Sequence, residues 1–357
     1  MATYKSIRYL VPDEVVEHTD SINALADVNT STVAPEVGQT LKWSAANSRW
    51  QPADIEESSF STTQKAIFSD GESSNLVSST GVVASDSSTA GTYRQFLGGS
   101  TYGGDKAIIA FGQASGGLQY GNRNNVTNLV SNTGVMASNT TVTGAQPRML
   151  VQGSHYGSDK AIFAFGAEAN EDYSYGRLNV SNLVSNTGFM SSDITGVGSA
   201  RSGASASSYG GDKAIFGYGE DVNFAFVNTS NLVSNTGVVA SDTTGVGSNR
   251  FDAAGAGYGG DKGMFGFGSG SSASLNVTNL ISNTGIVSSD TTGVGTARDS
   301  LGAAGYGGDK AIFGFGGNGN PTNVTNLVTN TGVVGSDQTG VGTARAGIAA
   351  AGFSSTA

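Results

Sequence analysis

Six arginines recur once in each of six similar segments, and a ring of guanidinium groups is one of the few arrangements in this sequence that could do chemistry. They stand at Arg94, Arg148, Arg201, Arg250, Arg298 and Arg345. Guanidinium groups donate paired hydrogen bonds to carboxylate, phosphate and carbonyl oxygens. A ring of them could bind an anionic ligand. The regular spacing favours a structural role instead, in which each arginine donates to carbonyl groups of a neighbouring repeat.

The inventory of catalytic residues is small. The chain has two histidines, His18 and His155, no cysteine, and no isolated pair of acids at the end of a predicted strand. These residues do not supply a nucleophile, a base and an orienting group. No stretch has the ligand density of a calcium loop, and the lack of cysteine excludes a thiolate site. We therefore expect a protein that is not an enzyme and that has no cofactor and no metal.

An aspartate also recurs, usually after a serine and ahead of a glycine-containing stretch. Its positions are Asp86, Asp193, Asp242, Asp290 and Asp337, with Asn139 in the second unit. Aspartate is a common turn former, so we expect a turn at each position. The segment "SSDTTGVG" (Ser288–Gly295) is similar to the Asp-box of sialidase propellers, but its glycine comes one residue late and the aromatic residue is missing. Asp-boxes are structural, so this similarity gives little support to glycosidase activity.

The elements that must position these residues repeat with a period of about 50 residues, which is typical of propeller blades. A lysine marks each repeat, at Lys65, Lys106, Lys160, Lys213, Lys262 and Lys310. The last full unit contains four pieces, "DSLGAAGY", "KAIFGFG", "NVTNLVTNTG" and "VVGSDQTGVG". Gly-Gly-Asp joins the first two pieces and Asn-Thr-Gly the last two, and both are signals of tight turns. Each unit is therefore predicted to be a four-stranded antiparallel meander.

The first unit is incomplete. It begins directly at the second piece, Lys65–Phe68, whereas the chain ends just after an additional first piece at Arg345–Phe353. The second pieces are apolar runs, as expected of strands covered on both faces, and the small residues of the first pieces suit the innermost strands. We predict an all-β fold in which residues 61–357 form a six-bladed β-propeller. Pairing of the C-terminal strand with the first blade is expected to close the ring.

The repeats resemble those of kelch propellers from Lys65 onward. The matching features are small residues after an arginine, a Gly-Gly hairpin, an apolar strand that ends in glycine, and a polar third strand. A double glycine follows the second strand only in "FGFGG" (Phe313–Gly317), and the outer-strand tryptophan usual in kelch units is absent from every repeat. The resemblance implies a kelch-like ring rather than descent from kelch proteins.

Residues 1–60 differ in composition from the repeats. Trp43 and Trp50 flank a polar turn, which predicts a β-hairpin, and the acidic segment after Pro12 predicts a short helix. The stretch Asp27–Asp54 resembles a short module of tail-fibre and other appendage proteins of tailed bacteriophages, especially marine ones. The resemblance implies an attachment arm, with its two tryptophans, that binds other virion proteins.

The connections between the second and third strands vary most between units. Those after Gly112, Gly166 and Gly219 are longer than the first unit's connection and contain aromatic residues. In an antiparallel meander these connections lie at one end of the ring, and loops gathered on a rigid scaffold often form a binding surface. The candidate binding residues are Tyr120, Asp172, Tyr173, Tyr175, Phe224 and Phe226. The alternative is that these loops fill space between neighbouring subunits.

The charge pattern limits the partners. The formal net charge is −10 and no basic run occurs, which argues against nucleic acid and anionic membranes. The first residues lack an apolar core of signal-peptide length, so we expect a virion protein assembled in the host cytoplasm. A homo-oligomer such as a trimer is compatible with a fibre, although no heptad or collagen-like stretch encodes one.

Together these features predict a structural protein of a phage tail, neck or capsid fibre. Its propeller is expected to adhere to a glycan or protein of the host surface. A purely structural component that packs against other capsid or tail subunits is the alternative, and a glycan depolymerase is a weaker one.

Overall fold

The structure is a computed structural model that describes residues 7–11, 14–18, 39–44, 48–54, 63–114, 122–169 and 175–357. Every regular element in these ranges is a strand. The chain divides into two compact units, Met1–Ser59 and Phe60–Ala357, hereafter the first and the second unit. No helix long and apolar enough to cross a membrane occurs within the described ranges.

Two hairpins make up the described part of the first unit. They are β1 (Ile7–Val11) with β2 (Glu14–His18), and β3 (Gln39–Ser44) with β4 (Arg49–Asp54). The second is the hairpin that the sequence predicts, with Trp43 opposite Trp50. The helix predicted after Pro12 is wrong where it should begin, because this segment is strand β2. Its adjacent β-branched valines favour an extended backbone when β1 offers a pairing partner.

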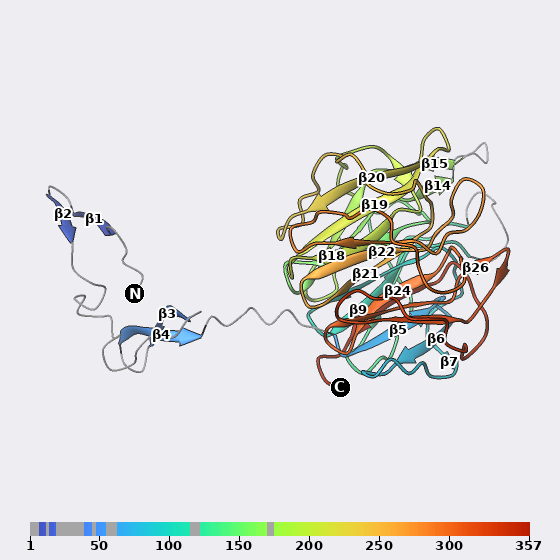
Figure 1. Cartoon of the computed structure of the whole chain (residues 1–357), viewed down its shortest axis with the longest axis horizontal. Coiled ribbons are helices and arrows are strands. Elements are labelled where there is room, and N and C mark those ends of the chain that lie inside the picture. Colours follow the sequence, from blue (N-terminus) through green and yellow to red (C-terminus); the bar gives the residue numbers. More distant parts are fainter. Residues whose placement is uncertain are drawn as a thin grey trace. The chain divides into compact units, whose positions relative to one another are not determined.

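The described part of the second unit contains six antiparallel sheets of three or four strands and two small two-stranded sheets. Figure 1 shows their strands side by side. In each of the six larger sheets, an inner strand pairs with a second strand, which pairs with a third. The inner strands are β8 (Gly98–Tyr102), β12 (Gln152–Tyr156), β18 (Ser205–Tyr209), β21 (Ala254–Tyr258), β24 (Gly302–Tyr306) and β29 (Ala349–Phe353). The second strands are β9 (Lys106–Ala110), β13 (Lys160–Ala164), β19 (Lys213–Asp221), β22 (Lys262–Gly266), β25 (Lys310–Gly314) and β5 (Lys65–Ser69). The third strands are β10 (Val126–Val130), β16 (Ser181–Val184), β20 (Phe226–Val233), β23 (Thr278–Ile281), β28 (Thr325–Val328) and β6 (Ser73–Val77).

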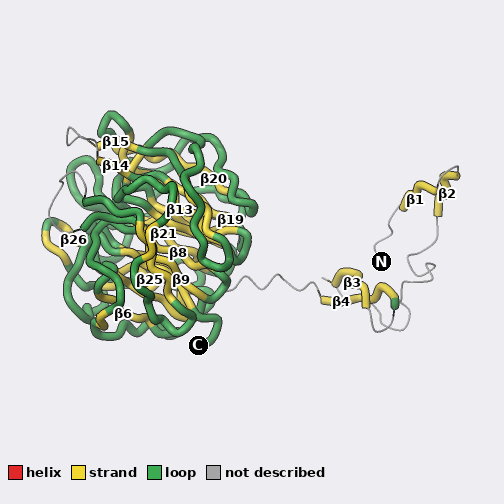
Figure 2. Tube along the Cα trace, turned by 180° about the vertical axis from the view of Figure 1, so that it is seen from behind, coloured by secondary structure: helices red, strands yellow, loops and turns green. Residues whose placement is uncertain are grey.

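Aromatic side chains in or just after the second strands join five of the six sheets to the next one. Ring centroids lie 5.1–6.1 Å apart in the pairs Phe111–Phe163, Phe165–Phe216, Tyr218–Phe265, Phe267–Phe313 and Phe315–Phe68. The second member of each pair is completely buried. Figure 2 shows the strands gathered in the interior of the second unit with loops around them. Cover on both faces explains why the second strands are continuous apolar runs.

The last strand belongs to the same sheet as the first repeat. β29 pairs antiparallel with β5, with Ala349 opposite Ser69 and Phe353 opposite Lys65, and the sheet continues through β6 to β7 (Ser87–Ser88). All five residues of β29 are buried. The incomplete first repeat therefore obtains its inner strand from the other end of the repeat region.

One end of the second unit, hereafter the turn end, contains the Gly-Gly-Asp turns. The first glycine of a turn donates its backbone N–H to the third-residue carbonyl of the next turn: Gly103 to Asp159, Gly157 to Asp212, Gly210 to Asp261 and Gly259 to Asp309, each at 2.7 Å. Two more bonds complete the series, from Gly307 to Gln64 at 3.0 Å and from Ser354 to Asp105 at 2.7 Å. Gln64 and Ser354 thus make the bonds of the turn that the first repeat lacks.

A second cycle of backbone hydrogen bonds lies at the opposite end, hereafter the loop end. In this cycle the backbone N–H of one residue donates to the carbonyl of another, at 2.6–3.1 Å. The bonds run from Leu150 to Phe96, Gly203 to Leu150, Asp252 to Gly203, Ser300 to Asp252, Gly347 to Ser300 and Phe96 to Gly347. All six residues have φ between 55° and 67°. This left-handed conformation costs a residue other than glycine about 1–2 kcal/mol, which the cyclic bonds offset.

The predicted fourth strand is confirmed in part. In the described ranges β7 and β11 (Thr140–Thr141) pair with the third strand as a fourth strand, and in the other sheets the fourth piece pairs with the third strand through isolated antiparallel bridges such as Val184–Met190. A side-chain hydrogen bond also links the third strand to the fourth piece. The recurring aspartate accepts from an asparagine of the third strand, as Asp193 does from Asn182 at 2.9 Å and Asp86 from Asn75 at 2.8 Å.

Candidate functional site

The six recurring arginines are buried, with exposed fractions of 0–9%. Each donates through Nη2 to a third-strand asparagine of its own sheet: Arg94 to Asn128, Arg148 to Asn182, Arg201 to Asn231, Arg250 to Asn279, Arg298 to Asn326 and Arg345 to Asn75. That asparagine donates in turn to the recurring aspartate, or to Asn139 in the second repeat. The sequence motif is therefore an Arg-Asn-Asp network within each sheet.

The neighbouring sheet supplies an aromatic ring to five of these arginines. The guanidinium carbon lies 3.9–5.0 Å from a ring centroid in the pairs Arg148–Phe111, Arg201–Phe165, Arg250–Tyr218, Arg298–Phe267 and Arg345–Phe315. Carbonyl bonds stay within the sheet, as from Arg148 Nε to the Phe165 carbonyl at 3.0 Å. The prediction of carbonyl partners in a neighbouring repeat is wrong, because the neighbour offers a π face. Burial between this π face and the Arg-Asn-Asp network keeps these five guanidinium groups away from a ligand in solution.

Two positions depart from the network. Asn139 replaces the aspartate beside Arg94, and burial lowers the pKa of Arg94 to about 10. Asp70 replaces the aromatic residue that Arg94 would face, and its carboxylate pairs with Arg345 at 3.1 Å. Arg94 is thus a buried cation for which no carboxylate partner occurs in the described part of the chain.

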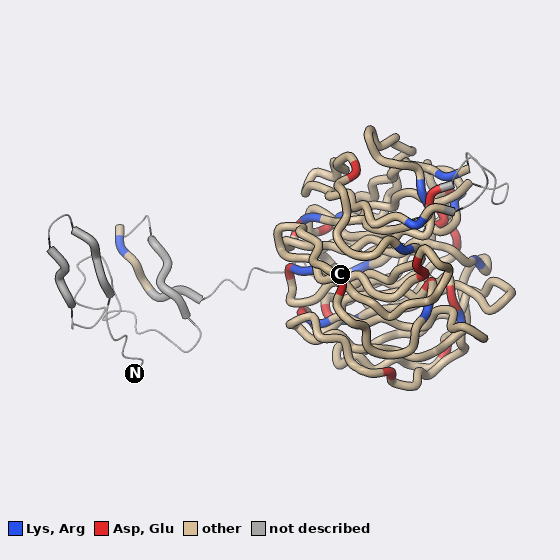
Figure 3. The backbone as a smooth tube through the Cα atoms, turned by 90° about the horizontal axis from the view of Figure 1, so that it is seen from above, with Lys and Arg blue, Asp and Glu red and all other residues tan. Residues whose placement is uncertain are grey.

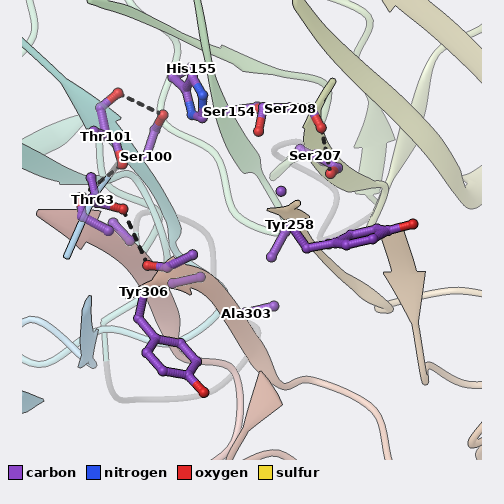
Figure 4. Close-up of a pocket in the computed structure, with 18 of the residues that line it drawn as sticks. Thr63, Ser100, Thr101, Ser154, His155, Ser207, Ser208, Tyr258, Ala303 and Tyr306 are labelled. Carbon is purple, nitrogen blue, oxygen red and sulfur yellow. Dashed lines mark hydrogen bonds between the residues drawn. The ribbon is translucent and has the colours of Figure 1, made fainter. Parts of the chain in front are cut away.

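The inner strands surround a narrow channel of about 100 Å³ (Figure 4). Its wall is mostly glycine, alanine and serine, with His155 and Thr101 among the polar side chains. Thr63, which precedes β5, donates to the Gly305 carbonyl at 3.3 Å and so packs against the wall. Burial lowers the pKa of His155 to about 4, so the imidazole is neutral at pH 7. The channel is smaller than usual ligand sites of about 300–1,000 Å³, and we do not assign the function to it.

The predicted binding residues divide into two groups. Tyr120, Asp172 and Tyr173 lie outside the described residues. Tyr175 begins β15 (Tyr175–Arg177), which pairs with β14 (Ala167–Ala169) at the loop end. Phe224 and Phe226 lie together at the tip of the β19–β20 hairpin. In Figure 1, β14, β15 and β26 (Gly317–Asn318), which pairs with β27 (Asn320–Pro321), all lie on the right of the second unit.

Phe224 and Phe226 line a groove of about 700 Å³. The groove is also lined by Gly270–Ala273 and Leu275, from the connection between β22 and β23, and by the exposed residues Ser248 and Asn249. Phe224 is 61% exposed, an unusual state for so large an apolar side chain. This volume is within the range of ligand sites, and we take the groove as the candidate site.

A neighbouring sheet holds the hairpin on the side away from the groove. Arg177 of β15 forms an ion pair with Glu220 of β19, and its guanidinium lies 4.4 Å from the ring centroid of Phe224. Turn formation is local: the Asp221 carboxylate accepts from the N–H groups of Asn223 at 2.8 Å and Ala225 at 3.0 Å. Hydrogen bonds from these two residues lower the pKa of Asp221 despite the opposing effect of burial, so the turn contains a carboxylate at pH 7.

Phe251 supports the second aromatic residue of the groove. Its ring stacks on that of Phe226 with centroids 5.6 Å apart and planes 11° apart. On another side it lies against Gly203, where a Cβ atom would collide with the ring. Sequence reasoning missed both Phe251 and Arg177. The available signal was that Phe251 is the one aromatic among residues following a recurring arginine.

An acidic pair beside the groove was also missed. The Ser300 hydroxyl lies 2.6 Å from Asp252 Oδ2 and 3.1 Å from Asp299 Oδ1. Burial raises the pKa of Asp252 to about 7. The Ser300 hydrogen bond opposes this shift and the Asp299 charge adds to it. Asp252 is only 8% exposed, which leaves it little access to a substrate.

Charges and metals add little to the site. Figure 3 shows Lys and Arg interspersed with Asp and Glu over the second unit. Among described residues, no three His, Asp or Glu side chains are grouped closely enough to hold a metal ion. The groove itself offers apolar surface, amide groups and hydroxyl groups.

Comparison with known proteins places the fold but not the function. No family model matches the chain, and no curated protein does. Among solved structures, one titled "Structure of YjhT" is similar, with a TM-score of 0.58 and 11% sequence identity, over 75% of this chain and 94% of that chain. YjhT is a β-propeller, and the all-β second unit with its antiparallel sheets has a β-propeller-like fold.

Proposed function

We propose that the six sheets are the blades of one kelch-like propeller whose ring is closed where β29 pairs with β5. The two cycles of backbone hydrogen bonds support this, because each passes once through every sheet and returns to its start. The Phe315–Phe68 contact supports it too, since it joins the sheets of the last and first repeats as other aromatic pairs join their neighbours.

The function that we propose is adhesion. The chain is then a structural protein of a tailed-bacteriophage particle, in a tail, neck or capsid fibre, and its propeller presents the loop end to the host cell surface. The groove with its exposed Phe224 carries this proposal, because exposed aromatic side chains in a concave site are frequent binding hot spots. The resemblance of Asp27–Asp54 to a phage appendage module supports the particle assignment.

The first unit is the proposed attachment arm to other virion proteins. Trp50, 40% exposed on its hairpin, offers an apolar anchor of the kind common at protein interfaces. In the second unit, the first described residues, Thr63 and Gln64, accept turn-end hydrogen bonds through their carbonyls from Gly308 and Gly307. A homo-oligomer, such as a trimer, remains part of this proposal.

Adsorption to host cells tests the function. Purified full-length chain, labelled with a fluorophore, is added to cells that the particle infects and to cells that it does not. The proposal predicts saturable binding to the first cells only, and protection of those cells from infection. Absence of binding to infected cells would overturn adhesion.

A purely structural role has one observation in its favour. Each turn between the third strand and the fourth piece exposes one large apolar residue, by 60–73%: Val82, Val135, Phe189, Val238, Ile286 and Val333. Apolar residues repeated at one position suit a flat contact with another subunit. Under this alternative, changing Phe189 and Ile286 to serine should block assembly into particles, while host adsorption of the free chain should be absent from the start.

A further inference from the structure

The groove of the loop end has no charged lining. Its lining contains phenylalanine, alanine, leucine, glycine, serine and asparagine only. The chain as a whole carries a formal net charge of −10, so an uncharged concave surface of about 700 Å³ is a local exception. An anionic ligand would find no cation in this groove and would be repelled by the net field of the protein.

The guanidinium group that lies against Phe224 is already engaged. Arg177 is paired with Glu220 and stacked against Phe224, and its side chain is only 6% exposed. It stabilises the platform from behind and is not available as a partner for a carboxylate or a sulfate. The charge pattern therefore selects for a neutral ligand.

The apolar part of the groove consists of flat aromatic surfaces. One face of Phe224 is covered by Arg177 and the residue remains 61% exposed, while Phe226 is held by stacking on Phe251. Fixed aromatic faces lose little conformational entropy on binding and contact C–H groups favourably. A pyranose ring presents such a face of C–H groups.

The rim of the groove supplies neutral donors and acceptors. Asn249, Ser271 and Ser272 are exposed there, and amide and hydroxyl groups both donate and accept hydrogen bonds. Ser248 has a fixed orientation, because its hydroxyl donates to Asp290 Oδ2 at 2.5 Å and its N–H to the same oxygen at 3.0 Å. Hydroxyl groups around a pyranose ring match this arrangement of polar groups around an aromatic platform.

We propose that the groove between the β19–β20 hairpin and the Gly270–Leu275 connection binds a neutral saccharide of the host surface. This inference rests on the proposed adhesion function and specifies its ligand class. Phe224 and Phe226 stack on sugar rings, and Asn249 with the serines of the Gly270–Leu275 connection binds their hydroxyl groups. Phe189 is the matched control residue, since it is a phenylalanine of similar exposure, 73%, at the turn end.

The experiment uses full-length chain and cells of an infected host in two arms. In the first, cells are treated with periodate, which cleaves vicinal diols of sugars, or with proteinase. In the second, envelope polysaccharide from the same host is separated by anion exchange into neutral and acidic fractions, and each is used to compete for adsorption. The variants are F224A, F226A and F189A.

We expect the neutral fraction to compete for adsorption and periodate treatment to abolish it. F224A and F226A should bind the saccharide at least about tenfold more weakly than the parent protein, and F189A should bind it equally well. Competition by the acidic fraction alone would overturn the inference. Sensitivity to proteinase with resistance to periodate would also overturn it and identify a protein receptor, leaving adhesion intact. Absence of adsorption from the untreated cells would overturn adhesion itself, so the two failures are distinguishable.

Discussion

The turn end and the loop end of the second unit are built from the same six repeats but differ in how much they vary. At the turn end, four successive turns make the same hydrogen bond at the same length, and each repeat exposes one apolar residue at the same position. At the loop end, the backbone cycle is equally regular, but the connections above it range from a tight Asx-type turn at Asp70 to the long β19–β20 hairpin. The hydrogen bonds that join neighbouring sheets are therefore the features that repeat most regularly. Variation is confined to segments that those bonds do not need.

The largest effect should come from removing the C-terminal strand that pairs with the first repeat. Deleting Arg345–Ala357 removes strand β29, the Arg345 network and the Ser354 bond together. We expect the melting temperature to fall by more than about 10 °C, or cooperative unfolding to be lost, because two sheet faces become exposed. Deleting Met1–Asp54 should leave the transition of the second unit nearly unchanged. Equal melting temperatures of the two truncated proteins, measured by circular dichroism, would contradict a closed ring.

A smaller effect is expected at the loop-end cycle. Gly203→Ala introduces a Cβ atom against the Phe251 ring at a residue whose φ is 59°. Gly260→Ala is the control at the turn end, where φ is 80° and no atom lies within 4 Å of the added carbon. Both variants should lose about 1 kcal/mol from backbone strain, and G203A should lose at least as much again from the collision. Equal losses in urea titrations would show that Phe251 does not pack as described.

The pH dependence of stability gives a further test at the loop end, through Asp252. Because the pKa of Asp252 is raised to about 7, the folded state holds a proton that the unfolded state releases between roughly pH 4 and 7. Its contribution to stability therefore falls as the pH rises through this range. Asp252→Asn should gain stability relative to the parent protein between pH 5 and pH 8, by a few degrees of melting temperature. The opposing slope from His155, whose pKa is lowered to about 4, cancels in this comparison. If the melting temperatures of the parent protein and of D252N changed in parallel with pH, the raised pKa of Asp252 would be ruled out.

The smallest effect is expected at Asn139, where the network of Arg94 lacks the carboxylate that the other networks have. Asn139→Asp supplies the carboxylate that the other repeats place near the buried arginine, and Thr92 is positioned to donate to it as Thr343 does to Asp86. We expect a stabilisation of about 0.5–1 kcal/mol at pH 7. The reverse change, Asp242→Asn, should destabilise: hydrogen bonds from Ser199 and Asn231 lower the pKa of this carboxyl against the effect of burial. Destabilisation by N139D would mean that Arg94 does not need a counter-charge.

The repeated features of the fold were predictable because they depend on local chemistry. Gly-Gly-Asp turns require positive φ, apolar runs require cover on both faces, and the orphan second piece at Lys65 requires a partner strand. The cyclic bonds at the loop end were not predictable. Their left-handed residues include Phe96 and Leu150, whose side chains give no sign of that conformation.

The candidate site was predictable only in part. Phe224 and Phe226 stand out as aromatic residues in a long connection, and the structure brings them together in the groove. Their supports come from other sheets, Arg177 before the hairpin and Phe251 after it, and sequence distance hides such contacts. In most sheets the fourth piece pairs with the third strand only through isolated bridges, which the sequence pattern does not distinguish from a continuous strand.

The most direct test compares substitutions at the loop end with substitutions at the turn end in one adsorption assay. Full-length chain with F224A and F226A at the loop end is compared with a chain carrying F189A and I286A at the turn end, each as a competitor of intact particles for host cells. The account predicts that the turn-end variant still blocks infection and that the loop-end variant does not. Loss of blocking by the turn-end variant, with full blocking by the loop-end variant, would contradict it.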